Sequence, residues 1–282
     1  MGIEPVMLPE NLQFGELAVF AAYAITTVLL LATIRKVRGT TLIGPWVWAV
    51  GSMVFLMLAE YTAKTSQSPS SIQYVAAVGL FCPMMSLLGA KRPQHSAWHL
   101  IVASLWVVLV LPAAESYFLR QGGKLQIHDA RGWFLWLLIG TGWLNHVLTR
   151  HWIACTLLAA AQVLLLTPHL PLLGEMQISR AVPAMLIASA AILVFVSRSR
   201  TAKGLDRVWL DFRDAYGTFW GVRVVDRVNA DSQRYDWPLR LEWMGIAQVD
   251  SPESPPDVPE EAANPEDTGK GKHYQLMSKR LN

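Results

Sequence analysis

The chain has 282 residues, 52% of them hydrophobic, and a formal net charge of only +3. Its basic residues are scattered through short segments and gather on no single stretch, which excludes nucleic-acid binding as an expected function. Cys82 and Cys155 are the two cysteines, and the absence of any Cys-x-x-Cys pair excludes zinc ribbons, haem-attachment signals and redox pairs.

The charged residues divide the chain into unlike parts. Residues 1–197 contain 18 charged side chains, whereas residues 198–282 contain 27, so the charge density rises more than threefold at one boundary. This contrast predicts a transmembrane helical domain over residues 1–197 and an aqueous C-terminal region. We divide that region into a cytoplasmic segment, 198–249, and a disordered tail, 250–282.

The first part predicts an all-α polytopic bundle, because about 20 apolar residues are needed to cross a bilayer. The segment Met1–Gly15 has no Lys or Arg, so the first apolar stretch is expected to be a retained span and not a cleavable signal. The fifth and sixth spans are short and form either a pair of thin spans or a re-entrant hairpin. The expected spans are Glu16–Ile34, Ile43–Ala59, Ile72–Leu88, Trp98–Phe118, Trp133–Leu148, Ile153–Thr167 and Val182–Val196.

The Lys and Arg residues of the loops predict the orientation, because they concentrate on the cytoplasmic side of bacterial membranes. The loops after the first, third, fifth and seventh spans hold 10 of them, against 5 in the other loops. We therefore expect an N-terminus outside the cell and a cytoplasmic C-terminus. The loop with Arg120, Lys124 and Arg131 is the evidence against this orientation.

Near the expected bilayer centre, the polar side chains are all neutral. Such groups usually join helices by hydrogen bonds, and the lack of a central charge weakens a proton-coupled transporter. Prolines inside three spans predict mild kinks whose freed carbonyls are satisfied by neighbouring helices. The polar residues are Ser52, Ser104, Thr141, Gln162 and Ser189, and the prolines are Pro83, Pro112 and Pro183.

Two carboxylates, Glu60 and Glu115, are expected near the outer ends of their spans. They are candidates for the outer mouth of a transporter or channel, where they would share a proton or bind a cation together. The alternative is that they are solvated charges at helix ends, or partners for Lys64 and Arg120.

Four histidines map near the cytoplasmic boundary, and imidazole is both a metal ligand and a haem ligand. His99 and His146 are the one pair expected to suit a transmembrane haem, and His95, His99 and His151 are weak candidates for a metal. The alternative is that these rings contact headgroups or backbone carbonyls. No cofactor is predicted.

The cytoplasmic segment contains an apolar stripe with helical spacing, which predicts an amphipathic helix. It is expected to lie in the membrane interface or dock under the bundle, or to present a face to a protein partner. Arg213 and Asp214 are among the charges assigned to its opposite face. The spacing of Gly217 and Gly221 permits close helix approach. The stripe comprises Leu205, Trp209, Phe212, Tyr216 and Phe219.

Beyond this helix, residues 222–228 are compatible with helix or strand. Alternating residues from Trp237 to Trp243 predict a strand, which must pair with something because one strand does not stand alone. Residues 250–267 are acidic and rich in proline, which predicts disorder, and the last stretch, from Lys270, is basic.

Three segments resemble uncharacterised multi-pass membrane proteins of planctomycete-type bacteria: LGAKRPQ at Leu88–Gln94, DARGWFLW at Asp129–Trp136 and the stretch Leu205–Asn229. The resemblance implies a bacterial inner membrane, and it implies no activity and no functional residues.

Three hypotheses follow for an integral inner-membrane protein whose partners are the lipid bilayer and a protein at the cytoplasmic helix. We favour a non-enzymatic scaffold or sensor component. The second is the transporter or channel with Glu60 and Glu115 at its mouth, and the third is a haem or metal redox protein using His99 and His146. No catalytic motif is present, although intramembrane enzymes can bring together residues that are distant in sequence.

Overall fold

The computed structural model describes residues 10–62, 69–89, 95–118, 128–173, 176, 178–197 and 204–248. The expected tail, 250–282, lies outside these residues. The first helices are α1 (Glu10–Ala32), α2 (Ile34–Val37), α3 (Ile43–Thr62), α4 (Pro69–Gly79), α5 (Cys82–Leu88) and α6 (His95–Phe118). They are followed by α7 (Asp129–His146), α8 (Trp152–Leu166), η2 (Thr167–His169), α9 (Ala181–Val196), α10 (Gly204–Tyr216), α11 (Thr218–Arg234), β1 (Leu239–Glu242) and β2 (Gly245–Gln248).

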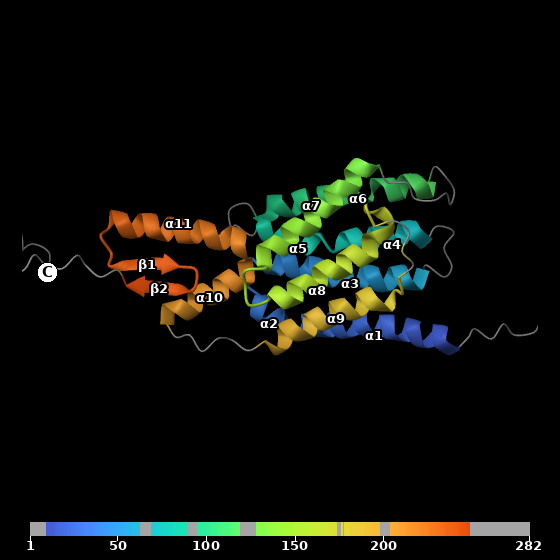
Figure 1. Ribbon diagram of the computed structural model, residues 1–282, viewed down its shortest axis with the longest axis horizontal. Helices are drawn as coiled ribbons and strands as arrows, with labels where there is room; N and C mark the ends of the chain where they lie inside the picture. Colours follow the sequence, from blue (N-terminus) through green and yellow to red (C-terminus); the bar gives the residue numbers. More distant parts are fainter. Residues whose placement is uncertain are drawn as a thin grey trace, which may run out of the picture.

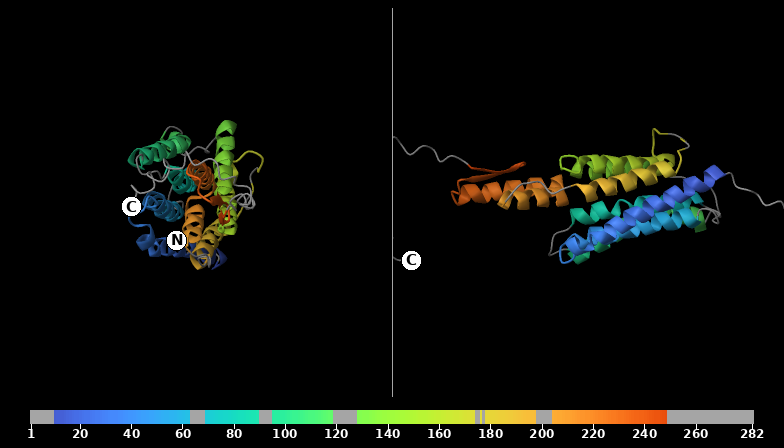
Figure 2. Two further views of the ribbon diagram at one scale, coloured as in Figure 1. Left: turned by 90° about the vertical axis from the view of Figure 1, so that its left-hand side faces the viewer. Right: turned by 90° about the horizontal axis from the view of Figure 1, so that it is seen from below.

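The helices α1 to α9 lie side by side in an elongated bundle (Figures 1 and 2). Helices α10 and α11 and the two strands extend beyond one end of this bundle, at the opposite end from the start of α1. We call α10, α11, β1 and β2, residues 204–248, the terminal module. It continues along the direction of the bundle axis, so α10 does not run across the end of the bundle as an interfacial helix would.

Five segments of the described chain are long and apolar enough to cross a membrane, where seven spans were expected. Helix α7 is not one of them, since it begins with Asp129 and Arg131, and α9 is apolar but only 16 residues long. The expected sixth span, Ile153–Thr167, corresponds to a longer segment in the structure. Helix α8 and η2 together form an apolar segment of 18 residues, Trp152–His169. The five segments are Gly15–Ala32, Ile43–Thr62, Ser70–Leu88, Ala97–Phe118 and Trp152–His169.

Small residues allow the bundle helices to approach closely. Ala22 of α1, Ala161 of α8 and Ala184 of α9 are buried in one cluster, and α9 packs against both other helices. Alanine at a helix interface brings backbones close together, which provides dispersion contacts where lipid removes the usual hydrophobic driving force. Large apolar side chains such as Leu100 and Phe118 instead point outward, as expected for surfaces that face lipid.

The segment containing α4 and α5 is broken at Leu80 and Phe81. Pro83 has no backbone N–H for the carbonyl of Gly79, four residues earlier, so a hydrogen bond of the helix is lost at this point. Ser52 Oγ of α3 donates to Gly79 O at 2.7 Å, and Gln162 Nε2 of α8 donates to Leu80 O at 3.4 Å. At Pro83 the expected kink is an interruption between α4 and α5, and the expected satisfaction by neighbouring helices is confirmed there.

The expected strand is confirmed as β1, and its partner is the following segment, β2. They form an antiparallel hairpin in which Leu241 lies opposite Ile246. Side chains of the two helices satisfy its outer edges: Asn229 accepts from Leu241 N at 2.8 Å and donates to its carbonyl at 3.0 Å, while Asp206 accepts from Ile246 N at 2.8 Å. Helices α10 and α11 thus cover both edges of a sheet that is too small to be stable alone.

Replacing Ser52 by alanine is expected to lower the free energy of unfolding by about 1 kcal/mol, because Gly79 O then stays buried without its partner. Thermal unfolding of the purified protein in detergent, followed by tryptophan fluorescence, measures this loss. Ser104→Ala is the matched control, since Ser104 is exposed on the outer surface of α6. Equal unfolding temperatures for both variants would contradict a structural role for Ser52.

Candidate functional site

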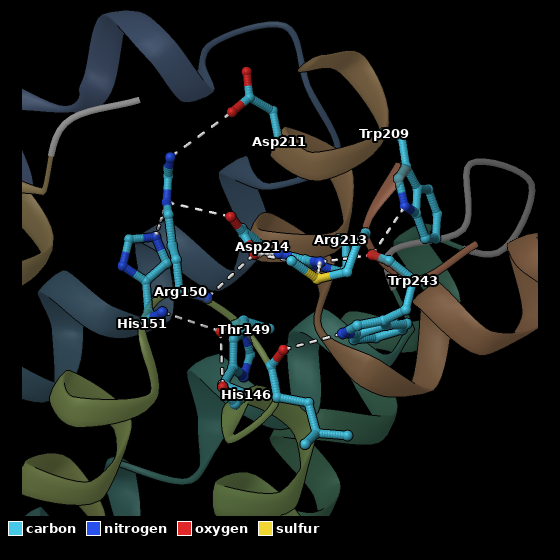
Figure 3. Close-up of polar contacts among 11 residues, drawn as sticks. His146, Thr149, Arg150, His151, Trp209, Asp211, Arg213, Asp214 and Trp243 are labelled. Carbon is cyan, nitrogen blue, oxygen red and sulfur yellow. Dashed lines mark hydrogen bonds and ion pairs between the residues drawn. The ribbon is translucent and has the colours of Figure 1, made fainter. Parts of the chain in front are cut away.

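The candidate site is the contact between the bundle and the terminal module, which we call the junction. On the bundle side it comprises the end of α7 and the link to α8, residues 145–151. Thr149 orders this link, because its hydroxyl donates to His146 O at 2.7 Å and accepts from His151 N at 3.2 Å. On the module side are the last turn of α10, the start of α11 and Trp243 in the β-turn (Figure 3).

A buried ionic network forms the centre of the junction. Arg213 Nη2 lies 2.8 Å from Asp214 Oδ1, and both side chains are only 1% exposed. Arg150 approaches the same carboxylate from the bundle: its backbone N donates to Oδ1 at 3.3 Å and its Nε lies 3.4 Å from Oδ2. Asp211 Oδ1 is 3.9 Å from Arg150 Nη1 at the exposed edge of the network. Asp214 thus joins a cation of the bundle to a cation of the module.

Trp243 extends the network to the β-hairpin. Its carbonyl accepts from Arg213 Nη1 at 2.7 Å and from Trp209 Nε1 at 3.3 Å, and its ring lies under the Arg213 guanidinium, 5.2 Å away. Its indole Nε1 donates to Leu148 O of the α7–α8 link at 3.2 Å. One side chain therefore contacts α10 and the bundle together.

Asn145 of α7 completes the first turn of α11. It is fully buried, its Oδ1 accepts from Phe219 N at 3.1 Å, and its Nδ2 donates to Tyr216 O at 3.3 Å. A helix N-terminus has unpaired N–H groups that a polar side chain usually caps, but here the cap comes from another helix of the chain. Sequence reasoning missed Asn145, although a polar Asn at the end of an apolar stretch could have drawn attention to it.

The two glycines of the expected Gly-x-x-x-Gly spacing contact side chains of the junction. Gly217 has φ +82°, and a Cβ there would lie 2.4 Å from Asn145 Nδ2. A Cβ on Gly221 would lie 2.9 Å from the ring of Trp243. Glycine is thus required at 217 by both its left-handed backbone and its close approach, and at 221 by the approach alone.

Two further hydrogen bonds tie the module to the same end of the bundle. Tyr216 Oη and Thr41 Oγ1, in the link before α3, are 2.7 Å apart. Trp220 Nε1 of α11 donates to Leu87 O at the end of α5, at 3.3 Å. Together with the α7–α8 link, these bonds join the module to three separate connections of the bundle.

Only some residues of the expected apolar stripe are buried in the structure. Trp209 is buried, Phe212 and Tyr216 are half-buried, and Leu205 is 67% exposed. Phe219 belongs to α11 and is 42% exposed. The assignment of Arg213 and Asp214 to the face opposite the stripe was wrong, because both are buried in the junction, as Trp209 of the stripe is.

His151 lies in the junction with its Nε2 accepting from Arg150 Nε at 2.9 Å, so its proton is on Nδ1. Nδ1 is buried and has no hydrogen-bond partner in the described part of the chain. Burial lowers the pKa of His151 below 6.5, the neighbouring Arg150 lowers it further, and Asp214 opposes both effects. His151 is therefore a neutral acceptor at neutral pH.

The other expected haem and metal ligands have different neighbours. His99 faces the start of α3, whereas His146 lies beside Asn145, with its Nδ1 3.3 Å from Asn145 Nδ2. The side chain of His95 lies outside the described residues. Across the residues that the structure describes, no group of three His, Cys, Asp or Glu side chains is arranged to hold a metal ion.

At the far end of the bundle, Glu60 pairs with Arg180, whose Nη1 is 3.3 Å from Glu60 Oε2. The amide oxygen of Gln73 also accepts from Arg180. Glu115 is exposed on α6. The expected partners, Lys64 and Arg120, lie outside the described residues, so the shared mouth of Glu60 and Glu115 stays a prediction.

Replacing Asp214 by asparagine is expected to lower the free energy of unfolding by about 3–5 kcal/mol, because the Arg213 guanidinium then stays buried without a counter-charge. Asp211→Asn is the matched control: Asp211 is 47% exposed, and its loss is expected to cost less than about 0.5 kcal/mol. Thermal unfolding in detergent compares the two variants, and equal midpoints would contradict the central role of Asp214.

Acid is expected to weaken the junction. Because the pKa of His151 is lowered on folding, the unfolded chain binds a proton more readily, so stability is full above about pH 6.5 and falls as the pH drops below it. Unfolding temperatures at pH 7.5 and pH 5.5 measure this fall. In His151→Gln the difference between the two temperatures is expected to shrink, and an undiminished difference would assign the pH dependence to other groups.

Comparisons with known proteins do not assign a function to the junction. No protein-family model, no curated protein and no solved structure matches the chain. The resemblance to planctomycete-type membrane proteins stays a prediction. What the junction does is therefore argued from its contacts, its charges and its place at one end of an apolar bundle.

Proposed function

We propose that the protein is an integral protein of a bacterial inner membrane, with its N-terminus outside and its terminal module in the cytoplasm. The five apolar segments support membrane embedding. The cations of α2 and of the α7–α8 link lie at the end of the bundle that bears the module (Figure 1), which supports the orientation because cytoplasmic loops are rich in Lys and Arg. These cations are Arg35 and Lys36 of α2, Arg38 directly after α2, and Arg150 of the link.

Within that membrane, the function we propose is that of a non-enzymatic scaffold or sensor component. The observation that carries this proposal is the buried network of Arg150, Asp214 and Arg213. If the terminal module were joined to the bundle only by a flexible linker, no buried ion pairs between the two would be required. A module fixed through Asn145, Arg150 and Trp243 keeps one distance and orientation to the membrane, so a bound partner is held in a defined place.

Helix α10 supplies the face for such a partner, as the amphipathic helix of the module. Leu205 is 67% exposed and Val208 is 65% exposed, one turn apart on the same side of the helix. The neighbouring residues Trp209 and Leu210 instead pack into the module core with Leu241. We propose that a cytoplasmic protein with an apolar surface binds over Leu205 and Val208.

A photo-crosslinking amino acid at Leu205 is expected to give a discrete protein adduct in intact cells, because that position is the most exposed of the stripe. The same reagent at Gln233, exposed on α11, is the positional control. Adding Val208→Asp is expected to reduce the Leu205 adduct at least fivefold, since a charge there cannot be buried against an apolar partner without cost.

The outcome that overturns this proposal is an identical adduct from both positions, or an adduct that Val208→Asp leaves unchanged. Unfolding temperatures of the variants show that the junction is intact. Deleting Leu205–Asn229 is a coarser test, because it also removes Arg213, Asp214 and Gly217 and thus the whole attachment of the module.

The alternatives have less support. A transporter is suggested by the broken helix at Leu80, since discontinuous helices often mark binding sites. However, Gly79 O and Leu80 O already have side-chain partners, and the adjacent cavity of about 60 Å³, lined by Phe81 and Leu138 among others, is apolar. A haem between His99 and His146 would need both rings to face one space, and they lie against different helices.

A further inference from the structure

A half-open groove of about 280 Å³ lies between the starts of α3 and α6. Both helices begin at the module end of the bundle: Thr41, just before α3, contacts Tyr216, and α6 follows α5, whose Leu87 carbonyl accepts from Trp220. Under the proposed orientation, the groove is therefore at the level of the cytoplasmic leaflet. Its lining residues are Ile43, Gly44, Val47, Trp48 and His99.

The chemistry of the groove suits a lipid. Its walls are apolar apart from His99 and the indole of Trp48, two amphipathic rings of the kind that favour the headgroup zone. Val47 is 55% exposed, so the groove opens on the outer surface of the bundle, where lipid would surround it. An acyl chain would contact mainly the apolar side chains of Ile43 and Val47 in such a groove.

Cations stand beside the groove. Helix α2 packs against α3, and its end is only a few residues before Ile43. Arg35, Lys36 and Arg38 are exposed, and none of them forms an ion pair with an acidic residue in the part of the chain that the structure describes. Each Lys or Arg near a membrane surface adds to the attraction for anionic lipid.

We propose that this groove and helix α2 form a binding site for one anionic phospholipid of the cytoplasmic leaflet. One acyl chain lies along Ile43, Val47 and Trp48, and the phosphate faces Arg35, Lys36 and Arg38. The inference rests on the membrane embedding and the orientation proposed above. A general excess of positive charge in cytoplasmic loops would not by itself predict a lipid site. Here, the unpaired cations and an apolar groove occur together at one place.

Native mass spectrometry of the full-length protein, purified in mild detergent, tests the site with two lipids of equal chain length. Phosphatidylglycerol is expected to be retained at least tenfold more than phosphatidylcholine. The triple variant Arg35→Gln, Lys36→Gln, Arg38→Gln is expected to lose that preference. Val47→Trp is expected to reduce retention of both lipids, because the indole fills the groove.

Two matched controls separate the site from general effects. Arg131→Gln removes an exposed cation at the opposite end of the bundle, and Val54→Trp adds the same indole two turns further along α3. Both are expected to retain phosphatidylglycerol as the parent does. Glycerol phosphate, which has the charge of the headgroup but no acyl chain, is expected not to compete.

Three results would overturn the proposed site: equal retention of the two lipids by the parent, unchanged retention in Val47→Trp, or competition by glycerol phosphate. The failure of membrane embedding has a different signature, namely release of the chain from membranes by alkaline carbonate. A protein that resists carbonate but shows no lipid preference would refute the lipid site and leave the embedding intact.

Discussion

The pairing of Asp214 with Arg213 and Arg150 is the interaction on which the arrangement of the two parts depends. A carboxylate that is 1% exposed is costly to bury, and its burial is tolerated because Arg213, Arg150 and the backbone N–H of Arg150 lie beside it. Those cations come from both sides of the junction. The network is therefore complete only when the terminal module occupies one position against the bundle.

The same constraint acts inside the bundle, where a buried backbone carbonyl needs a hydrogen-bond donor from the protein itself. Pro83 leaves Gly79 O without its helical donor, and Ser52 supplies one from α3. Gln162 does the same for Leu80 O from α8. The break in the central helix is thus stabilised by its neighbours, and these two polar side chains join α3, the α4–α5 segment and α8 into one packed unit.

Much of the fold could be predicted from the sequence, because apolar length and strand alternation are local signals. Five of the seven predicted apolar segments, and a strand within the predicted Trp237–Trp243, are found in the structure. The junction could not be, because Asp214 meets a bundle residue 64 positions away and Asn145 caps a helix 74 positions away. Charges on a helix resemble a solvated face until their distant partners are known, which is why Arg213 and Asp214 were misassigned.

The cap that Asn145 provides for α11 makes the terminal module depend on the bundle. Synthesis proceeds from the N-terminus, so α7 and the α7–α8 link emerge before α11 does. The first turn of α11 gains its acceptor only once Asn145 is in place, and Asp214 gains Arg150 at the same moment. The C-terminal fold is thus complete only when the α7–α8 hairpin that it packs against has folded.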